Sequence, residues 1–148
     1  MNETLKQLLF FARYLQGEDT QTVVGVILKD LGFRSNKRGF MFLKVAVELY
    51  HEDPAQLITC GLYLEMSKYF NRRVSKAQIE VSIRRAIKAA WLNRSQTVWD
   101  LYFPGGITTR KTGPSNTEFI SGMSDLLELW EVCCRSLKNT CGEVYEHE

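Results

Sequence analysis

Positively charged side chains gather in one stretch of this sequence, between Lys68 and Arg94. They stand against a single acidic residue, Glu80, so the stretch has a local formal charge of +7 in a chain whose formal total is +2. Clustered Lys and Arg side chains can bind the phosphates of a nucleic acid. The alternative is an ordinary solvated helix face, because both residue types are common on protein surfaces. The cations are Lys68, Arg72, Arg73, Lys76, Arg84, Arg85, Lys88 and Arg94.

Two helical patterns position these cations, one on each side of a polar break at 71–75. Apolar residues recur at helical spacing from Leu62 to Phe70 and again from Ile79 to Ala90. Ser75 stands directly before the second pattern, where its hydroxyl can accept a hydrogen bond from a free amide of the first helical turn. Two helices joined by a short polar turn predict a helix-turn-helix, with its recognition helix at Lys76–Trp91.

The outward face of the predicted recognition helix combines small and cationic side chains. With the isoleucines of this helix turned inward, about 3.6 residues per turn place the residues between them outward. Small side chains near the start of a helix allow close approach to the major groove, and cations bind its phosphates. We expect base contacts from Lys76, Ala77, Gln78, Val81, Arg84 and Arg85. We expect phosphate contacts from Lys68, Arg72, Arg73, Lys88, Arg110 and Lys111.

The apolar periodicity of the whole chain predicts an all-α fold, a compact bundle of about six to seven helices. An amphipathic helix in residues 1–18 either packs on its own domain, which we favour, or forms a dimer contact. The helix-turn-helix domain is assigned to residues 19–132, and residues 133–148 to a helix end and an acidic, frayed tail. A short apolar segment around Trp99 is expected to pack behind the recognition helix. Further helix boundaries are expected at Asp19 or Thr20, Gly32, Asp53-Pro54, Ser115 or Asn116, and Leu137.

Composition describes an ordinary globular chain without a membrane segment. Of its 148 residues, 45% are hydrophobic and 24% are charged, which is typical of a single folded domain. From Glu118 to the C-terminus the formal charge is −5, opposite in sign to the basic stretch. No run approaches the roughly 18 apolar residues of a membrane span, and no signal-peptide pattern is present. We therefore expect a cytoplasmic protein that does not contact membranes.

No arrangement of residues predicts an active site, a metal site or a cofactor site. His51 and His147 are isolated in the sequence, and there is no Gly-rich phosphate loop or Ser/His/Asp pattern. The cysteines lack the spacing of zinc ligands, and we expect reduced thiols at Cys60, Cys133, Cys134 and Cys141. The chain is therefore not expected to be an enzyme or to bind a metal or cofactor.

Five sequence blocks, in this order along the chain, resemble one known family. They are ILKDLGF at Ile27–Phe33, KRGFMFLKVAVELY at Lys37–Tyr50, ITCGLYLEMSKYFN at Ile58–Asn71, IRRAIKAAW at Ile83–Trp91 and GPSNTEFI at Gly113–Ile120. The family is the C-terminal effector domain of the master sporulation response regulator of spore-forming Firmicutes. The similarity extends over about Val23–Leu129, most of the chain.

The resemblance implies a fold, a function and partners. The family has an all-helical domain with a helix-turn-helix, and it binds promoter DNA, so double-stranded DNA is the first partner implied. The family binds tandem sites, which implies a homodimer on DNA, and RNA polymerase or its sigma factor is a further implied partner. The regulator carries a phosphorylatable receiver domain upstream, which this sequence lacks, so control through a phosphoaspartate is not predicted.

This sequence differs from the family at the positions that read bases in the family. The family's recognition helix begins with two arginines flanking a glutamate, and the matching positions here hold Gln78 and Val81 around Glu80. Arg84 matches a family arginine, and Arg85 stands where the family has a histidine. The preceding turn is also longer than the family's. We therefore do not carry over the family's target sequence, and Gln78 with Val81 suggests a preference for A·T-containing steps.

Two functions of different classes follow from these observations. The first is a sequence-specific DNA-binding transcription regulator that acts through major-groove binding of its recognition helix. The alternative is a protein-interaction module that kept the fold but lost specific DNA reading. The missing arginines and the N-terminal helix favour the module, whereas the local positive charge favours DNA binding. Salt-sensitive binding to mixed duplex DNA would distinguish them.

Overall fold

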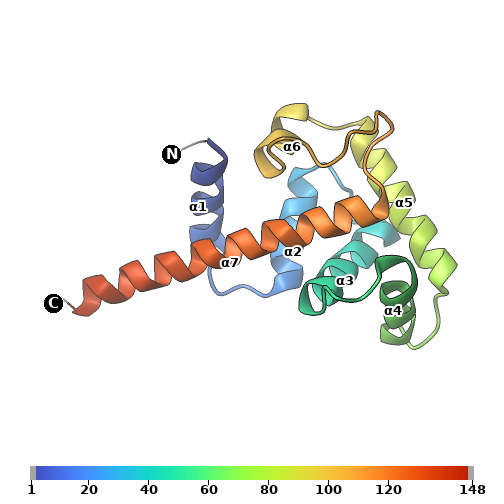
Figure 1. Cartoon of the computed structure of the whole chain (residues 1–148), viewed down its shortest axis with the longest axis horizontal. Coiled ribbons are helices and arrows are strands. Elements are labelled where there is room, and N and C mark those ends of the chain that lie inside the picture. The colour runs from blue at the N-terminus through green and yellow to red at the C-terminus, as the bar shows by residue number, and fades with distance from the viewer. Residues whose placement is uncertain (1–2, 147–148) are drawn as a thin grey trace.

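The part of the chain that the structure describes is built from seven α-helices and one π-helical turn. A computed structural model describes the backbone of residues 3–146 and the side chains of residues 5–58 and 61–139. The predicted all-α class is confirmed (Figure 1). The elements are α1 (Glu3–Leu15), α2 (Thr20–Asp30), α3 (Arg38–Glu52), the π-turn η1 (Ile58–Leu62), α4 (Tyr63–Tyr69), α5 (Lys76–Leu92), α6 (Gln96–Tyr102) and α7 (Asn116–Glu146).

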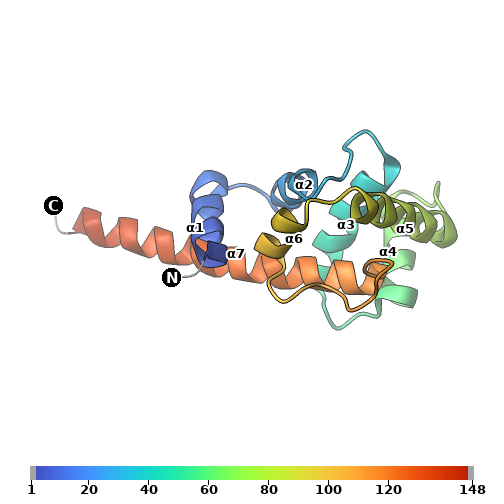
Figure 2. The same cartoon turned by 90° about the horizontal axis from the view of Figure 1, so that it is seen from above.

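Helix α7 runs along the long axis of the molecule (Figures 1 and 2). Helices α2 to α6 lie around its first half, and α1 packs further along, where Cys134 of α7 contacts the Ala12 carbonyl. The inner face of α7 buries Phe119, Ile120, Met123 and Leu127. Helix α3 packs against α2, α5 and α7, and α5 lies at the end of the molecule opposite the C-terminus (Figure 1). Helix α7 continues beyond the predicted end near Leu137. No helix in the described residues has the length and apolar character that crossing a membrane requires.

Helix α1 packs on its own domain, the arrangement favoured for the amphipathic helix predicted in residues 1–18. Its inner face buries Leu8, Phe11, Ala12 and Leu15 against α7 and α6. The ring of Phe11 meets that of Tyr102 edge to face, with 6.2 Å between centroids. This is the amphipathic stripe predicted for residues 1–18, and it explains why this helix belongs to the bundle.

The predicted boundaries of α2 are confirmed, but the helix predicted to start at Asp53-Pro54 is absent. Asp19 caps α2 by accepting a hydrogen bond from the Thr22 amide at 2.7 Å. Asp53 instead ends α3, because its amide donates to the Leu49 carbonyl at 3.2 Å. The next helical element begins only at Ile58, as the π-turn η1. An Asp-Pro pair can follow a helix as well as open one, and here its backbone completes the preceding helix.

The thiols in the described residues are free. Cys133 is buried, and Cys134 is partly buried and donates to the Ala12 carbonyl of α1 at 3.8 Å. Burial raises the pKa of both thiols, so they stay protonated at neutral pH. The side chains of Cys60 and Cys141, and residue His147, lie outside the described residues. Within those residues, no group of His, Cys, Asp and Glu side chains is placed to hold a metal ion.

His51, which looked isolated in the sequence, connects α3 to α7. Its Nδ1 lies 2.9 Å from the Ser124 hydroxyl, and its Nε2 lies 2.8 Å from a carboxylate oxygen of Glu131. Ser124 is buried, so its hydroxyl needs a partner within the protein. No sequence pattern indicates this connection, because the partners are more than seventy positions away in the chain.

Replacing His51 by alanine should lower the free energy of unfolding by about 1–3 kcal/mol, because the buried Ser124 hydroxyl loses its partner. Urea unfolding followed by circular dichroism measures this loss. Glu131→Gln is the control, because the glutamine amide still offers an oxygen to the imidazole. This variant should lose less free energy of unfolding than His51→Ala. Equal stability of His51→Ala and the wild type would show that this connection contributes nothing.

Candidate nucleic-acid interface

The predicted helix-turn-helix is formed by α4, a turn at 70–75 and α5. The turn contains two non-glycine residues in the left-handed region, Asn71 with φ of 56° and Arg72 with φ of 60°, a conformation that costs free energy. It is held by the Ser67 hydroxyl, which donates to the Val74 carbonyl at 2.7 Å, and by the Arg72 amide, which donates to the Ser67 carbonyl at 2.7 Å. These bonds fix the points at which the exposed side chains of Arg72 and Arg73 leave the backbone.

A capping box closes the N-terminus of α5 and engages Gln78. The Ser75 hydroxyl accepts from the Gln78 amide at 3.2 Å, and the Ser75 amide donates to Oε1 of Gln78 at 2.8 Å. The predicted cap at Ser75 is confirmed. A glutamine pairs with adenine through both the oxygen and the nitrogen of its side-chain amide. The preference for A·T-containing steps suggested by Gln78 therefore requires this box to open.

Replacing Gln78 by glutamate should separate its two roles. Glutamate can also accept from the Ser75 amide, so stability should stay within about 0.5 kcal/mol of the wild type. The new carboxylate would face DNA phosphates, and we expect affinity for duplex DNA to fall at least about tenfold. Thermal melting and fluorescence anisotropy measure the two effects. If Gln78→Glu binds duplex DNA with the same affinity as the wild type, residue 78 does not lie near the DNA.

The two faces of α5 separate as the sequence predicts. The inner face buries Ile79, Ile83, Ile87 and Ala90. Among the expected base-contacting residues, Val81 is only partly exposed, and the exposed ones are Lys76, Ala77, Gln78, Arg84 and Arg85. The expected phosphate-contacting residues are all exposed: Lys68, Arg72, Arg73, Lys88, Arg110 and Lys111.

Asn116, the first residue of α7, connects three helices next to the exposed face of α5. Its side-chain amide donates to the Tyr63 hydroxyl of α4 and to the Glu80 carbonyl of α5, both at 3.1 Å. Glu80 also forms an ion pair with Arg84, one turn later, at 3.6 Å. Burial raises the pKa of Tyr63, so its hydroxyl stays protonated. This junction fixes α5 relative to α4 and α7, and the sequence gives no local signal for it.

Trp91, at the end of α5, holds the loop at 107–115 beside the recognition helix. Its indole Nε1 donates to the Lys111 carbonyl at 3.1 Å. Gly113 has φ of +101°, and a Cβ there would lie 2.7 Å from Cγ of Trp91, so only glycine allows this close packing. The guanidinium of Arg94 stacks on the same indole at 3.7 Å. Arg94 therefore has a structural role within the basic stretch.

A second capping box fixes the other end of this loop, as the Ser115–Glu118 spacing predicts. The Ser115 hydroxyl accepts from the Glu118 amide at 3.1 Å, and the Ser115 amide donates to Glu118 Oε1 at 3.0 Å. This backbone hydrogen bond is the main cause that lowers the pKa of Glu118. The carboxylate form is therefore the stabilising one, and its contribution is lost as the pH falls through that lowered pKa.

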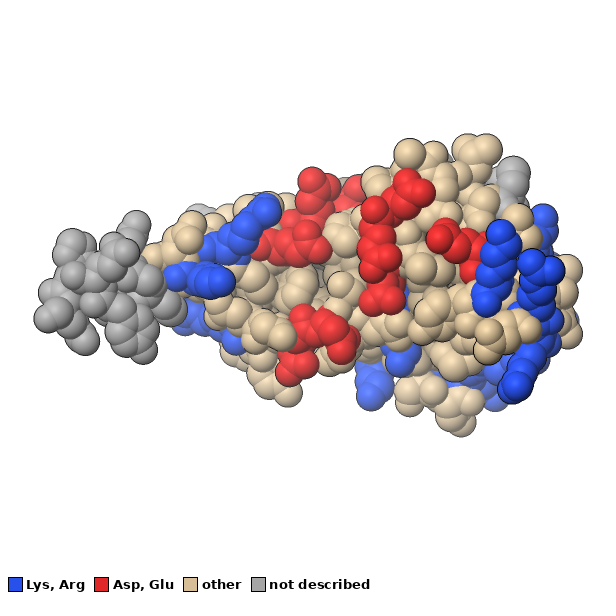
Figure 3. Space-filling model, turned by 90° about the horizontal axis from the view of Figure 1, so that it is seen from below, with Lys and Arg blue, Asp and Glu red and all other residues tan. Residues whose placement is uncertain are grey.

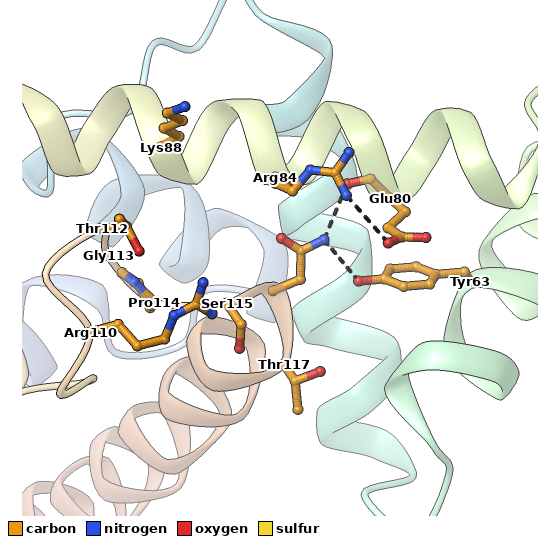
Figure 4. A pocket seen from close by; sticks show the side chains of 11 residues that line it. Tyr63, Glu80, Arg84, Lys88, Arg110, Thr112, Gly113, Pro114, Ser115 and Thr117 are labelled. Atoms are coloured by element: carbon orange, nitrogen blue, oxygen red, sulfur yellow. Dashed lines mark hydrogen bonds and ion pairs between the residues drawn. The ribbon is translucent and has the colours of Figure 1, made fainter.

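A cleft of about 530 Å³ lies between α5, the loop at 107–115 and the start of α7. Arg84 and Lys88 of α5 and Arg110 of the loop lie around it (Figure 4). Hydroxyls of Thr112, Ser115 and Thr117 add hydrogen-bonding groups to its wall. Cations and hydroxyls together suit a phosphate group.

The charges of the molecule are unevenly distributed along its length. Lys and Arg side chains gather at the end occupied by α4 and α5, and Asp and Glu side chains lie across the middle (Figure 3). In the described part of the chain, Arg84 is the only cation of α4, the turn at 70–75 and α5 that forms an ion pair with a carboxylate. The positive charge of this end is therefore largely uncompensated and available to an anionic partner.

An all-α domain that presents a basic recognition helix from a helix-turn-helix belongs to the DNA-binding class of such folds. The family described as sporulation initiation factor Spo0A C terminal matches residues 24–127. The chain belongs to this family of DNA-binding sporulation initiation factor domains, which is regulatory rather than enzymatic. The resemblance noted in the sequence is confirmed, and helix α1 lies outside the matched range.

Proposed function

We propose that this chain is a sequence-specific transcription regulator of the sporulation-initiation effector type, which inserts α5 into the major groove of DNA. The observation that carries the proposal is the exposed face of α5, where Ala77 stands among Arg84, Arg85 and Lys88. A helix with its side chains is about 10–12 Å wide, and the major groove is about 12 Å wide. Small residues on this face permit deep insertion, and long cations reach the base edges and the backbone.

In this proposal the base-reading residues are Lys76, Ala77, Gln78, Val81, Arg84 and Arg85. Arg85 is the strongest reader among them, because an arginine can donate two hydrogen bonds to guanine and its side chain is exposed without an ion pair in the described structure. Gln78 and Val81 select A·T-containing steps once the capping box opens. A recovered binding site with guanine at every contacted position would contradict that selection.

The turn between α4 and α5 provides the test of DNA binding itself. We expect Arg72→Gly with Arg73→Gln to weaken binding to every sequence. The salt slope, which is the slope of log affinity for DNA against log salt concentration, should decrease in magnitude by about 1.8, because each phosphate contact contributes about 0.9. Glycine is chosen at position 72 because the backbone there is left-handed and glycine adopts that conformation freely. Fluorescence anisotropy with a random-sequence duplex pool at several salt concentrations gives the slope.

The matched control removes two exposed cations from the far end of α7, Arg135→Gln with Lys138→Gln. It changes the total charge by the same amount and should leave the slope unchanged. Wild-type binding that does not depend on salt would contradict the proposed function, and so would equal slopes for the turn variant and this control.

The proposal includes partners beyond one duplex. Two copies on tandem sites could bring surfaces of opposite charge near each other, since α5 is basic and the middle of α7 carries Asp125, Glu128 and Glu131. RNA polymerase or its sigma factor would be the target of activation, in the cytoplasm. The alternative function, a protein-interaction module, is favoured by the exposed aromatic rings of Phe10 and Tyr14 on the outer face of α1.

A further inference from the structure

The recognition helix has a second basic loop beside it, on the side away from Arg110 and Lys111. This loop joins α2 to α3 and carries the exposed cations Arg34 and Lys37. A groove of about 320 Å³ separates it from α5, and the groove is lined on the α5 side by the small residues Ala86 and Ala89. None of the residues proposed above for DNA contact lies in this loop.

The α2–α3 loop is held firmly against the domain at both ends. At its start, Phe33 is buried and packs on Phe119, with 5.2 Å between ring centroids. At its end, Phe40 is buried, and Gly39 is so close to α5 that an added Cβ would lie 2.6 Å from the Ser82 carbonyl oxygen. The loop therefore presents Arg34 from a fixed backbone.

The two basic loops lie on opposite edges of the exposed face of α5. At about 100° per residue, Glu80, Arg84 and Lys88 form the edge next to the cleft near Arg110. Ala86 and Ala89 form the other edge, next to the α2–α3 loop. The exposed strip between these edges is the face that would enter the major groove.

The cations of the α2–α3 loop are free to bind an external anion. In the described part of the structure, no carboxylate lies within ion-pair distance of Arg34 or Lys37. The backbone here keeps them close together, since the Lys37 amide donates to the Arg34 carbonyl at 3.2 Å. Two uncompensated cations at a groove beside a recognition helix match the position of a DNA backbone.

We propose that Arg34 and Lys37 bind phosphates of one DNA strand while Arg110 and Lys111 bind phosphates of the other. A helix in the major groove has a sugar-phosphate backbone on each side, so loops on opposite edges of α5 meet different strands. This inference rests on the proposed function, and it adds a second phosphate-binding wall to the interface. The domain would then contact the phosphates of both strands that border the major groove. These contacts would set the tilt of α5 within the groove.

The test compares two double variants with the wild type, Arg34→Gln/Lys37→Gln and Arg110→Gln/Lys111→Gln. Anisotropy titrations with the random duplex pool should show that each double variant reduces the salt slope by about 1.8. Raising the salt concentration from about 50 to 200 mM lowers the affinity of all these proteins for DNA. The factor by which affinity falls should be about 12 times smaller for each double variant than for the wild type. Arg135→Gln/Lys138→Gln is the charge-matched control, and circular dichroism melting checks that every variant is folded.

Phosphate ethylation interference on a duplex recovered by the wild type locates the contacts. Arg34→Gln/Lys37→Gln should lose interference at phosphates of one strand, and Arg110→Gln/Lys111→Gln at phosphates of the opposite strand. A slope for the first variant equal to that of the charge-matched control would overturn the inference, as would loss of the same phosphates in both variants. Either result leaves the proposed function standing, whereas absence of salt-dependent binding by the wild type removes both.

Discussion

Alanine at position 39 is expected to lower the free energy of unfolding by about 3 kcal/mol, a large effect for one methyl group. Gly39 lies in the first turn of α3, where that helix crosses α5. An added Cβ would lie 2.6 Å from both the Ser82 carbonyl oxygen and Cβ of Ala86. Neither atom belongs to the end of a flexible side chain, so α3 and α5 would have to move apart. The same shift would displace the recognition helix and weaken DNA binding.

Gly25→Ala is the matched control for this prediction. Gly25 is also a buried helical glycine, but its Cβ would meet Cδ of Lys44 at 3.4 Å, an ordinary contact with a flexible side chain. Alanine is about 1 kcal/mol better than glycine inside a helix, so Gly25→Ala should be neutral or stabilising. Urea unfolding of both variants gives the comparison. Equal stabilities would show that the crossing of α3 and α5 is looser than the structure indicates.

Arg85→Ala is expected to weaken specific DNA binding by about 1–3 kcal/mol, roughly 5- to 150-fold. Arg85 is exposed on the outward strip of α5, and no carboxylate of the described structure pairs with it. The substitution removes nothing from the core, so stability should change by less than about 0.5 kcal/mol. Anisotropy titration with a duplex recovered by the wild type measures the loss.

Arg85→Lys distinguishes base reading from charge alone. Lysine keeps the positive charge but cannot form the planar bidentate pair of an arginine. If Arg85 reads a guanine, the lysine variant should lose specific affinity and keep the salt slope of the wild type. If lysine restores full specific affinity, Arg85 acts only as a phosphate-binding charge.

The sequence was sufficient for the elements of the interface whose signals are local. The isoleucine stripe of α5, its cap at Ser75, the cap of α2 at Asp19 and the capping box at Ser115 depend on residues within one or two helical turns. The Ser75–Gln78 spacing is itself a capping-box signal. That signal was available in the sequence and would have shown that Gln78 has a structural role.

The parts of the interface that the sequence did not predict depend on contacts between distant segments. The Trp91 indole donates a hydrogen bond to the Lys111 carbonyl. Asn116 connects α7 to α4 and α5, and His51 connects α3 to α7. No periodicity or spacing marks such pairs, because their partners are adjacent only after the helices pack. The left-handed conformation of Arg72 was unpredictable for a different reason, since arginine rarely adopts it.

The most direct test of DNA reading by α5 is selection of duplexes from a random-sequence pool, followed by sequencing of the bound fraction. We expect the wild type to enrich one short motif, and Arg85→Ala to lose the preference at one position of that motif while keeping the rest. Binding without an enriched motif would contradict the claim, because it would show that α5 contacts the DNA backbone without reading bases.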